Sequence, residues 1–250
     1  MLANRVVPCL DIDDGRVVKG VRFQGLRDAG SPVECARAYE MQGGDEIVLL
    51  DVSATPQGRA NNLAVVDAVR QVLSIPLTVG GGVRAAGDAA RLLDAGADKV
   101  GVNTAAVERP GLITEMKDRF GAQCTVVAVD AARSGPGWEV VVRSGTERTG
   151  IDAVEWCEKA VSRGAGEILL TSWDRDGTGE GYDVDLIDQV TDAVNVPVIA
   201  SGGANGHLHM IEAYEAGATA ALIASILHDG VTTVGELKAG ITSAGIRVRP

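Results

Sequence analysis

The stretch IPLTVGGGV (Ile75–Val83) decides the fold, because it returns in recognisable form as VPVIASGGA (Val196–Ala204). Two further segments repeat in the same way. GGDEIVLLD (43–51) returns as GAGEILLTS (164–172), and GADKVGVNTAAV (96–107) returns as GATAALIASIL (217–227). All three repeats share an offset of 121 residues in a chain of 250. A constant offset of about half the chain indicates a duplicated half-structure. The glycine-rich turns repeat with it, so we expect the sites beside them to come in pairs.

Short apolar runs alternate along the chain with stretches of helical periodicity. The eight runs are residues 6–10, 47–50, 76–79, 100–102, 125–129, 168–170, 197–200 and 220–224. Alternating strands and helices favour a parallel sheet, and (β/α)8 barrels often have about 250 residues in one domain. We therefore predict an α/β protein, a single (β/α)8 TIM barrel over residues 1–250, built from two repeated half-barrels at about 1–121 and 122–250. An open doubly wound sheet would not normally repeat itself in halves.

The overall composition argues against several classes of function. A net charge of −11 and a pI near 4.7 do not suit nucleic acid or anionic membrane surfaces. No stretch approaches the roughly 20 apolar residues of a membrane helix, and the opening MLANRVVPCLD lacks the apolar region of a signal peptide. Cys9 and Cys124 lie inside apolar runs and are expected to be reduced core residues. We expect a cytoplasmic protein.

Two aspartates close predicted strands on opposite sides of the barrel. Asp11 ends the first strand and Asp130 ends the fifth, and active sites of such barrels lie at the C-terminal strand ends. Two carboxylates that face each other across one pocket suit general acid and general base roles, provided that their surroundings separate their pKa values. Either aspartate alone could instead cap the segment that follows it. The opposed pair favours the catalytic interpretation.

The other strand ends carry small or hydroxyl-bearing residues. Glycine turns let backbone N–H groups approach an anion closely, and here one turn follows the third strand and its repeat follows the seventh. Each glycine turn lies beside a polar residue at the end of the next strand. We therefore expect two sites that bind phosphate groups, and a ligand that carries a phosphate at each end. The residues assigned to this pocket are Gly82, Asn103, Thr104, Thr171, Ser201, Gly203, Ala224 and Ser225.

Two loops add charged candidates. Residues 18–30 are long for a βα loop and predict a mobile lid. Lys19 within it could close over a phosphate or polarise a reacting group, although exposed loop lysines are often only solvated. DRDGTGEGYD (174–183) follows the sixth strand and brings Asp176 and Gly177 near the second glycine turn. We interpret it as a substrate loop rather than a purely structural turn.

No metal site or cofactor is predicted. The segment 174–183 lacks the bidentate glutamate that a calcium loop of the EF-hand type requires. His207 and His209 are two residues apart at the start of a predicted helix and do not share a face. With His228 they form no metal triad with matched carboxylates.

A second group of charges is predicted at the opposite end of the barrel. Side chains alternate along a strand, so residues of the same parity share a face. By this rule one charged side chain from each of strands 1, 2, 4 and 6 points inward at the bottom. Two cations and two anions there would balance, either as a salt-bridge plug or as a gate for something small. The four residues are Arg5, Glu46, Lys99 and Glu167.

With these residues in place, the chain resembles the cyclase subunit of imidazole glycerol phosphate synthase, of histidine biosynthesis, over essentially its whole length. The sister family, the phosphoribosyl-formimino isomerase of the preceding step, shares the half-barrel repeat and the opposed aspartates. The opening segment, the TSWDRDGT segment and the bottom charges resemble the cyclase. The most specific segments are PCLDIDDGRVVKGVRF with Asp11 and Lys19, TVGGGV, GADKVGVNTAAV, VAVDA with Asp130, GAGEILLTSWDRDGTGEGYD and IASGGA.

The resemblance implies a specific reaction. Ammonia from a separate glutaminase subunit would pass the bottom gate and react at the top with phosphoribulosyl-formimino-aminoimidazole carboxamide ribotide, which carries two phosphates. The products would be imidazole glycerol phosphate and aminoimidazole carboxamide ribotide, with Asp11 and Asp130 as acid and base. The partner would dock on the bottom face, at Asp98 and Gln123. One phosphate would bind at Gly82, Asn103 and Thr104, and the other at Gly177, Gly203, Ala224 and Ser225.

The chain departs from the family pattern in two places. Trp173 stands where a slimmer aliphatic residue is usual, and RSGPGWE (133–139) looks locally variable. Three alternatives remain open at this point: the isomerase, a barrel that accepts both substrates, and a non-catalytic scaffold that only activates a glutaminase.

Overall fold

The computed structural model describes residues 3–21 and 24–249, and within these ranges eight parallel strands close into a barrel. Hydrogen-bonded neighbours run β10–β11–β12–β1–β4–β5–β6–β7, and β7 pairs with β10 to complete the ring. The predicted (β/α)8 TIM barrel is therefore confirmed. The barrel strands are β1 (Arg5–Asp13), β4 (Ile47–Asp51), β5 (Leu77–Gly80), β6 (Lys99–Val102), β7 (Thr125–Ser134), β10 (Glu167–Ser172), β11 (Val198–Ser201) and β12 (Ala220–Ile223).

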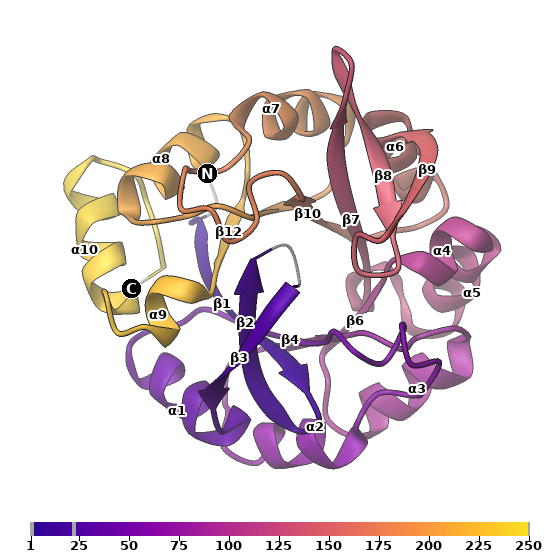
Figure 1. Ribbon diagram of the computed structural model, residues 1–250, viewed down its shortest axis with the longest axis horizontal. Helices are drawn as coiled ribbons and strands as arrows, with labels where there is room; N and C mark the ends of the chain where they lie inside the picture. Colours follow the sequence, from indigo (N-terminus) through magenta and orange to yellow (C-terminus); the bar gives the residue numbers. More distant parts are fainter. Residues whose placement is uncertain (1–2, 22–23, 250) are drawn as a thin grey trace.

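Helices surround the barrel on its outside, as the view down the barrel axis shows (Figure 1). Local caps fix several of their starts. The Asp152 side chain accepts hydrogen bonds from two N–H groups of the first turn of α6, and Thr233 and Glu236 form a capping box on α10. The helices are α1 (Pro32–Met41), α2 (Leu63–Arg70), α3 (Ala86–Asp94), α4 (Thr104–Glu108), α5 (Gly111–Phe120), α6 (Ala153–Ser162), α7 (Val184–Ala193), α8 (His207–Glu215), α9 (Ser225–His228) and α10 (Val234–Ser243), with a 3-10 turn η1 (Ala122–Cys124).

The predicted lid at 18–30 is not a loop. It forms two antiparallel strands, β2 (Arg16–Val21) and β3 (Gln24–Gly30), which extend β1. Arg22 and Phe23, which the lid prediction also covered, lie outside the described residues. The variable segment after the fifth barrel strand is likewise a hairpin: β7 continues into β8 (Gly137–Val142) and β9 (Glu147–Asp152). Both half-barrels therefore carry a hairpin on their first strand.

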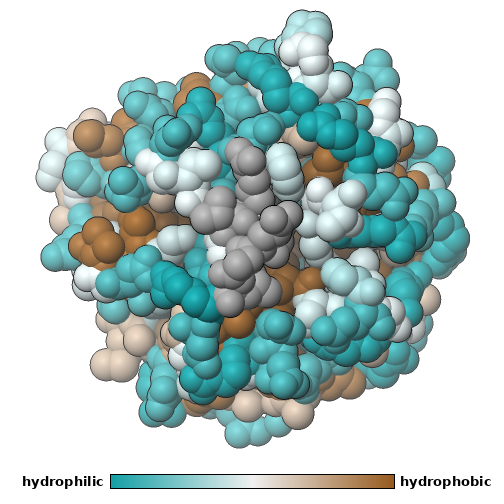
Figure 2. Space-filling model, in the orientation of Figure 1, coloured by the Kyte–Doolittle hydropathy of each residue, from teal (hydrophilic) through white to brown (hydrophobic). Residues whose placement is uncertain are grey.

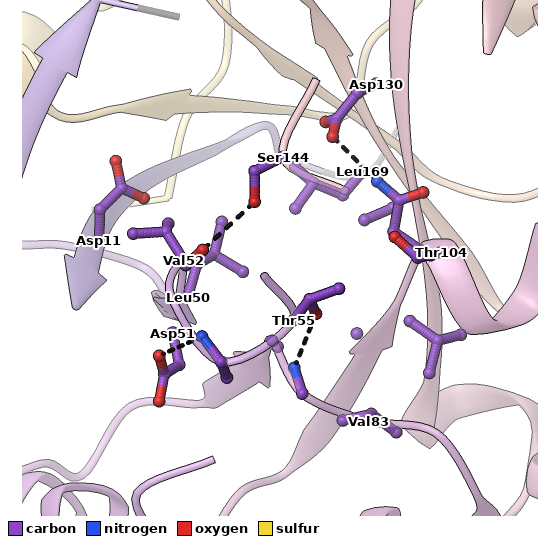
Figure 3. Close-up of a pocket in the computed structure, with 18 of the residues that line it drawn as sticks. Asp11, Leu50, Asp51, Val52, Thr55, Val83, Thr104, Asp130, Ser144 and Leu169 are labelled. Carbon is purple, nitrogen blue, oxygen red and sulfur yellow. Dashed lines mark hydrogen bonds between the residues drawn. The ribbon is translucent and has the colours of Figure 1, made fainter. Parts of the chain in front are cut away.

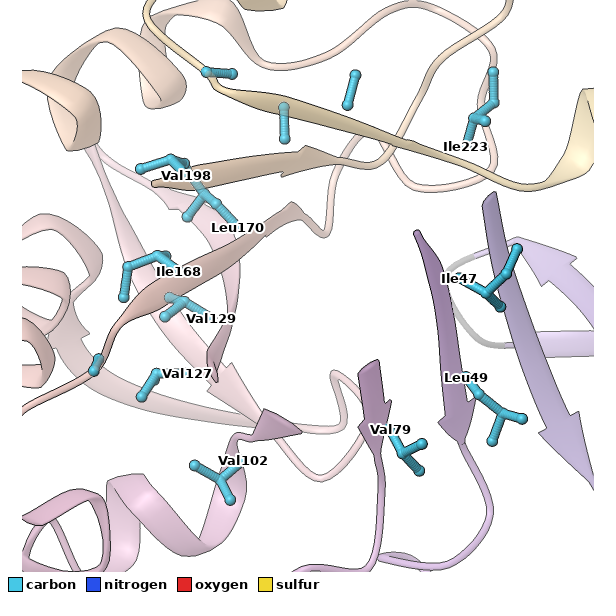
Figure 4. Packing of buried hydrophobic residues seen from close by; sticks show 14 of the residues in the cluster. Ile47, Leu49, Val79, Val102, Val127, Val129, Ile168, Leu170, Val198 and Ile223 are labelled. Carbon is cyan, nitrogen blue, oxygen red and sulfur yellow. The ribbon is translucent and has the colours of Figure 1, made fainter. Parts of the chain in front are cut away.

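The hydrophobic core has two parts. The larger part lies between the outer faces of the strands and the helices, where Figure 4 shows residues such as Leu49, Val79 and Leu170. A smaller cluster, drawn from alternate strand positions, fills the inside of the barrel: Val7, Cys9, Val48, Val126, Leu169, Ile199, Ala220 and Leu222. This inner layer separates the two ends of the barrel. Cys9 is buried in it as expected, but Cys124 is only half-buried, because it lies in the 3-10 turn before β7 rather than inside the strand.

Figure 2 shows that hydrophilic residues cover most of the face seen in Figure 1. Among the described residues, no helix combines the length and apolar character needed to cross a membrane.

Candidate active site at the C-terminal end of the barrel

Two adjoining cavities open at the C-terminal ends of the strands. One is about 280 Å³ and is lined mainly by loops after β4, β5 and β6, and the other is about 250 Å³ and is lined by loops after β10, β11 and β12. Lys19, Asp176, Ser201 and Ala224 line both, so the cavities meet at these residues. The first cavity also contains Asp11, Gly82, Asn103, Thr104, Asp130 and Thr171, and the second contains Gly177, Gly203 and Ser225. The structure thus gathers all the residues assigned from the sequence to the substrate pocket.

Asp11 and Asp130 lie on opposite sides of the first cavity (Figure 3). Their strands, β1 and β7, are four places apart in the ring of eight, so the predicted opposition is confirmed. Neither residue ends its strand, because each strand continues into its hairpin: Asp11 is paired with Val18 of β2, and Asp130 with Val141 of β8. The hairpins therefore fix the backbone at both carboxylates.

Lys19 joins the two halves of the site. It lies on β2, and its buried Nζ is 3.5 Å from Asp11 Oδ2 and 3.7 Å from Asp176 Oδ1. Burial alone would lower the pKa of Lys19, but the charges of Asp11 and Asp176 outweigh it and raise the pKa. Lys19 is therefore a protonated, anchored lysine and not a solvated loop lysine.

The surroundings of Asp130 favour its protonated form. Burial, reinforced by the charges of Asp176 and Asp11, raises the pKa of Asp130 to about 7, although hydrogen bonds from Asn103 and Thr171 act in the opposite direction. The Asn103 Nδ2 group donates to Asp130 Oδ2 at 2.9 Å. Near neutral pH this carboxyl group is therefore present in both protonation states, as a group that transfers protons should be.

The two glycine turns have closely similar geometry. Gly82 has φ of +69° and Gly203 has φ of +98°, a region that favours glycine. A Cβ at Gly82 would lie 2.9 Å from the Arg59 carbonyl oxygen, and one at Gly203 would lie 2.3 Å from the Gly181 carbonyl oxygen. Each turn is thus pressed against the preceding βα loop at the edge of its cavity, and the Gly82 N–H donates to Thr55 Oγ1 at 3.3 Å. Paired glycine turns of this kind are compatible with paired anion sites.

At the other end of the barrel the four predicted charges form a closed ring. Arg5 donates to Glu46 at 2.9 Å and also to Glu167, while Lys99 Nζ lies 2.9 Å from Glu46 Oε2 and 2.7 Å from Glu167 Oε2. The two carboxylates are almost completely buried. Burial lowers the pKa of Arg5, but its two carboxylate partners raise it by more. The parity argument from the sequence is therefore confirmed for the positions of these side chains.

Asp98 and Gln123 lie at the same end, just before β6 and β7. Asp98 is half-exposed and accepts hydrogen bonds from the Leu77 N–H at 2.8 Å and from Arg70 Nη1 at 3.1 Å. Gln123 lies in the 3-10 turn and donates to the Phe120 carbonyl oxygen at 3.4 Å. Both thus lie at the end of the barrel opposite the cavities, separated from them by the length of a strand.

The reasoning from sequence missed Asp51, which lines the first cavity, and its neighbours Arg59 and Asn61, which lie behind the lining. Asp51 is buried and holds Arg59 through two hydrogen bonds of 2.6 and 2.7 Å, and Asn61 Nδ2 donates to the Gly80 carbonyl oxygen at 2.8 Å. The position of Asp51 at a strand end was a usable signal. Arg59 and Asn61 lie in an irregular loop without periodicity, so no local pattern pointed to them. Arg84 and the turn at Arg143–Ser144 also line the first cavity.

Two of the histidines make hydrogen bonds. His209 Nδ1 accepts a hydrogen bond from the Asn205 N–H at 3.1 Å, and His228 Nδ1 is 2.6 Å from the Tyr39 hydroxyl. Within residues 3–21 and 24–249, no group of three or more His, Cys, Asp or Glu side chains could hold a metal ion.

Comparison with known proteins assigns the chain to a family. A family profile described as "Histidine biosynthesis protein" matches residues 5–233. The chain is similar over its full length to proteins named "Imidazole glycerol phosphate synthase subunit HisF". It is 57% identical to that of Caulobacter vibrioides over 97% of the relative's length, 54% to that of Myxococcus xanthus over 99%, and 52% to that of Exiguobacterium sibiricum over 100%. These names favour the synthase subunit over the sister isomerase. The chain belongs to the histidine-biosynthesis protein family and, within it, to the HisF subunits of imidazole glycerol phosphate synthase, which are enzymes of the lyase class.

Proposed function

We propose that the two cavities bind phosphoribulosyl-formimino-aminoimidazole carboxamide ribotide across the barrel mouth and that Asp11 and Asp130 carry out its reaction with ammonia. The observation that supports this most strongly is the placement of two opposed carboxylates between two glycine-turn cavities. A ligand with a phosphate in each cavity would lay its central, reacting part between the carboxylates. The proposed contacts are Gly82, Asn103 and Thr104 for one phosphate and Gly177, Gly203, Ala224 and Ser225 for the other, with Thr171 and Ser201 between them.

The chemistry requires proton transfer at two stages. Ammonia adds to the ribulosyl carbonyl and water leaves. The new nitrogen then closes the imidazole ring at the formimino carbon, and the amine of aminoimidazole carboxamide ribotide leaves. Asp130, whose pKa is about 7, suits the donor that protonates the leaving groups. Asp11, ion-paired with a protonated Lys19, suits the acceptor. Lys19 holds Asp11 and Asp176 at the junction of the cavities, and Asn103 holds Asp130.

The proposed route of ammonia runs along the barrel axis. The charge ring closes the bottom, and the apolar inner layer around Val48, Val126 and Leu169 lies between the ring and the mouth. Neutral ammonia can cross an apolar layer at much lower cost than an ammonium ion. We therefore assign the ring the role of a gate, and the face with Asp98 and Gln123 the role of docking a glutaminase subunit. The proposal keeps the cytoplasmic location expected from the sequence.

The test is turnover of the bis-phosphorylated ribulosyl substrate by the purified chain in ammonium buffer at alkaline pH, with a control that lacks ammonium. Release of aminoimidazole carboxamide ribotide should depend on ammonium. Asp11→Asn and Asp130→Asn should each lower kcat by about 10² or more, the range for loss of a general acid or base. The exposed variant Asp67→Asn should retain full activity.

Other outcomes would contradict the proposal in different ways. Isomerisation of the aminoaldose precursor without any nitrogen donor would make the chain an isomerase. Retention of turnover in both aspartate variants would remove these residues from the chemistry. Binding of the substrate with no turnover at all would favour the scaffold.

A further inference from the structure

The turn between β8 and β9 holds an uncommon backbone conformation. Arg143, Ser144 and Gly145 have φ values of +53°, +57° and +78° in succession. Among the described residues, the only other non-glycine residue with positive φ is Asp14. Tight hairpin turns of this shape usually place Asn-Gly or Asp-Gly at the centre, because other side chains are strained there. Consecutive strained residues that line a cavity point to a role at the site.

This turn, which belongs to the second half-barrel, binds two segments of the first half-barrel. The Arg143 N–H donates to Thr104 Oγ1 at 3.0 Å, and Arg143 Nη2 donates to Glu108 at 2.7 Å, so the turn is bound to the segment after β6. The Ser144 hydroxyl donates to the Val52 carbonyl oxygen at 3.2 Å, which binds it to the segment after β4 (Figure 3). A hairpin of the second half-barrel thus reaches across the first cavity.

The hydrogen bond from Arg143 to Thr104 affects the direction in which the Thr104 hydroxyl can donate its own proton. A hydroxyl group donates one hydrogen bond and accepts up to two. Because Thr104 Oγ1 accepts from the Arg143 N–H, its own proton remains available to donate to an anion in the cavity that Thr104 lines. The Arg143 guanidinium is half-exposed and already ion-paired with Glu108 and Glu147. The turn therefore affects the cavity through the backbone N–H group of Arg143 rather than through the charge of its guanidinium group.

Trp173 determines where the turn can lie. A Cβ placed on Gly145 would be 2.1 Å from Trp173 Nε1 and 2.6 Å from Trp173 Cδ1. The turn is therefore seated directly on the indole ring, which itself follows β10. Any side chain at Gly145 would move the turn away from Trp173 and shift the Arg143 N–H relative to Thr104.

We propose that the 143–145 turn, seated on Trp173, is a positioning element of the first phosphate subsite, and that it orients the Thr104 hydroxyl toward a phosphate monoester bound beside Gly82. This inference rests on the proposed function, which places one phosphate of the substrate there. The inference predicts that Trp173 and Gly145 affect phosphate binding at the first subsite and not at the second.

The chain offers a matched pair of substitutions. Gly145→Ala adds a methyl group that collides with Trp173. Gly135→Ala adds one at φ of +57° on the same extension, in the β7–β8 turn, with no atom within 4 Å of the new Cβ. Both variants carry the same kind of backbone strain, so a difference between them reports the displacement of the turn. Gly145→Ala combined with Trp173→Val removes the collision.

Binding is measured by titrating inorganic phosphate into isotope-labelled full-length protein and following amide signals of Gly82 and Thr104 for the first site and of Gly203 and Ser225 for the second. Gly145→Ala should raise the phosphate Kd about fivefold at the first site, the effect of losing one oriented hydrogen bond, and leave the second unchanged. Gly135→Ala should change neither site, and the combined variant should recover the wild-type Kd. In ammonium-driven turnover, Gly145→Ala should raise KM much more than it lowers kcat.

Four results would overturn the inference. Equal weakening of both sites in Gly145→Ala would indicate a general loss of structure, and the same loss in Gly135→Ala would indicate strain alone. Failure of Trp173→Val to restore binding would show that the indole does not set the position of the turn. If phosphate does not perturb Gly82 and Thr104 in the wild type, the proposed substrate site itself is wrong, which distinguishes that failure from the others.

Discussion

At the scale of single residues, Asp130 is the group whose chemistry depends most on its surroundings. It is buried between Asn103 and the charge of Asp176, and its pKa of about 7 compares with 3.8 for an unperturbed aspartate. Asp11, across the cavity, has the Lys19 ammonium beside it instead. The same residue type on opposed strands is thus given two environments, which is the usual way for one site to hold an acid and a base together.

The pKa of Asp130 predicts a pH-dependent cost to stability. Between pH 4 and pH 7 the folded protein keeps the Asp130 proton that the unfolded chain releases, so stability falls as pH rises through this window and the loss is complete above about pH 7. Asp130→Asn cannot ionise and escapes this loss. Its stability relative to wild type should rise by roughly 3 kcal/mol between pH 4.5 and pH 8.

Urea unfolding of both proteins at the two pH values measures this difference. The exposed variant Asp67→Asn should show no comparable pH-dependent change. An Asp130→Asn effect that is equal at pH 4.5 and pH 8 would mean that Asp130 titrates normally in the folded protein.

The sequence allowed the direction of some side chains to be predicted but not their partners. Strand parity correctly placed Arg5, Glu46, Lys99 and Glu167 in one ring, because alternation along a strand is strict. Lys19 was expected on a loop, and nothing local indicated that its ammonium would lie between Asp11 and Asp176. That contact depends on how β2 folds back over the barrel mouth.

At the scale of elements, the turn between β1 and β2 shows a signal that was available and not used. Asp14-Gly15 lies between two segments with alternating apolar residues, and an Asp-Gly pair in that setting is a strong hairpin signal. In the structure Asp14 has φ of +46° and Gly15 has φ of +75°. Length alone suggested a loop at 18–30, whereas the turn chemistry favoured strands.

The β2–β3 hairpin should open locally without unfolding the barrel. Exposed side chains hold it: Arg16 bonds to Asp28 at 2.9 and 3.0 Å, and Asp28 accepts from the Gly30 N–H at 2.7 Å. These hydrogen bonds hold the pKa of Asp28 below its usual range, so the contacts persist until the pH falls below that range. Asp28→Ala should speed proteolytic cleavage within residues 24–30 and leave the urea midpoint unchanged.

Limited proteolysis with mapping of the cut sites tests this prediction. Asp118→Ala, which removes an exposed ion pair on α5, is the matched control and should not change the cleavage pattern. If Asp28→Ala instead lowers the urea midpoint together with faster cleavage, the hairpin and the barrel unfold as one cooperative unit.

At the scale of the whole molecule, the candidate active site lies at one end of the barrel and the charge ring at the other, with an apolar layer between them. The repeat offset and the alternation of strands and helices were sufficient to predict the barrel, and strand parity predicted the charge ring at its bottom, but the apolar layer was not predicted. The cross-barrel contacts were not predictable. Ser144 and Val52 are 92 residues apart, and no periodicity links a hairpin turn in one half to a loop in the other.

The charge ring predicts how the stability of the whole barrel depends on the balance of charges within the ring. Arg5 and Lys99 each bind both Glu46 and Glu167. Glu46→Gln leaves the buried Arg5 and the partly buried Lys99 to share one carboxylate, and it should destabilise the protein by about 3 kcal/mol or more. Glu46→Gln combined with Lys99→Met removes one charge of each sign and leaves the Arg5–Glu167 pair. The double variant should therefore be more stable than Glu46→Gln alone by at least about 1 kcal/mol.

Urea unfolding of the wild type, both single variants and the double variant measures this coupling. If the costs of the two single substitutions simply add, the four charges act as independent contacts, and the ring is not the charge-balanced unit that its geometry indicates.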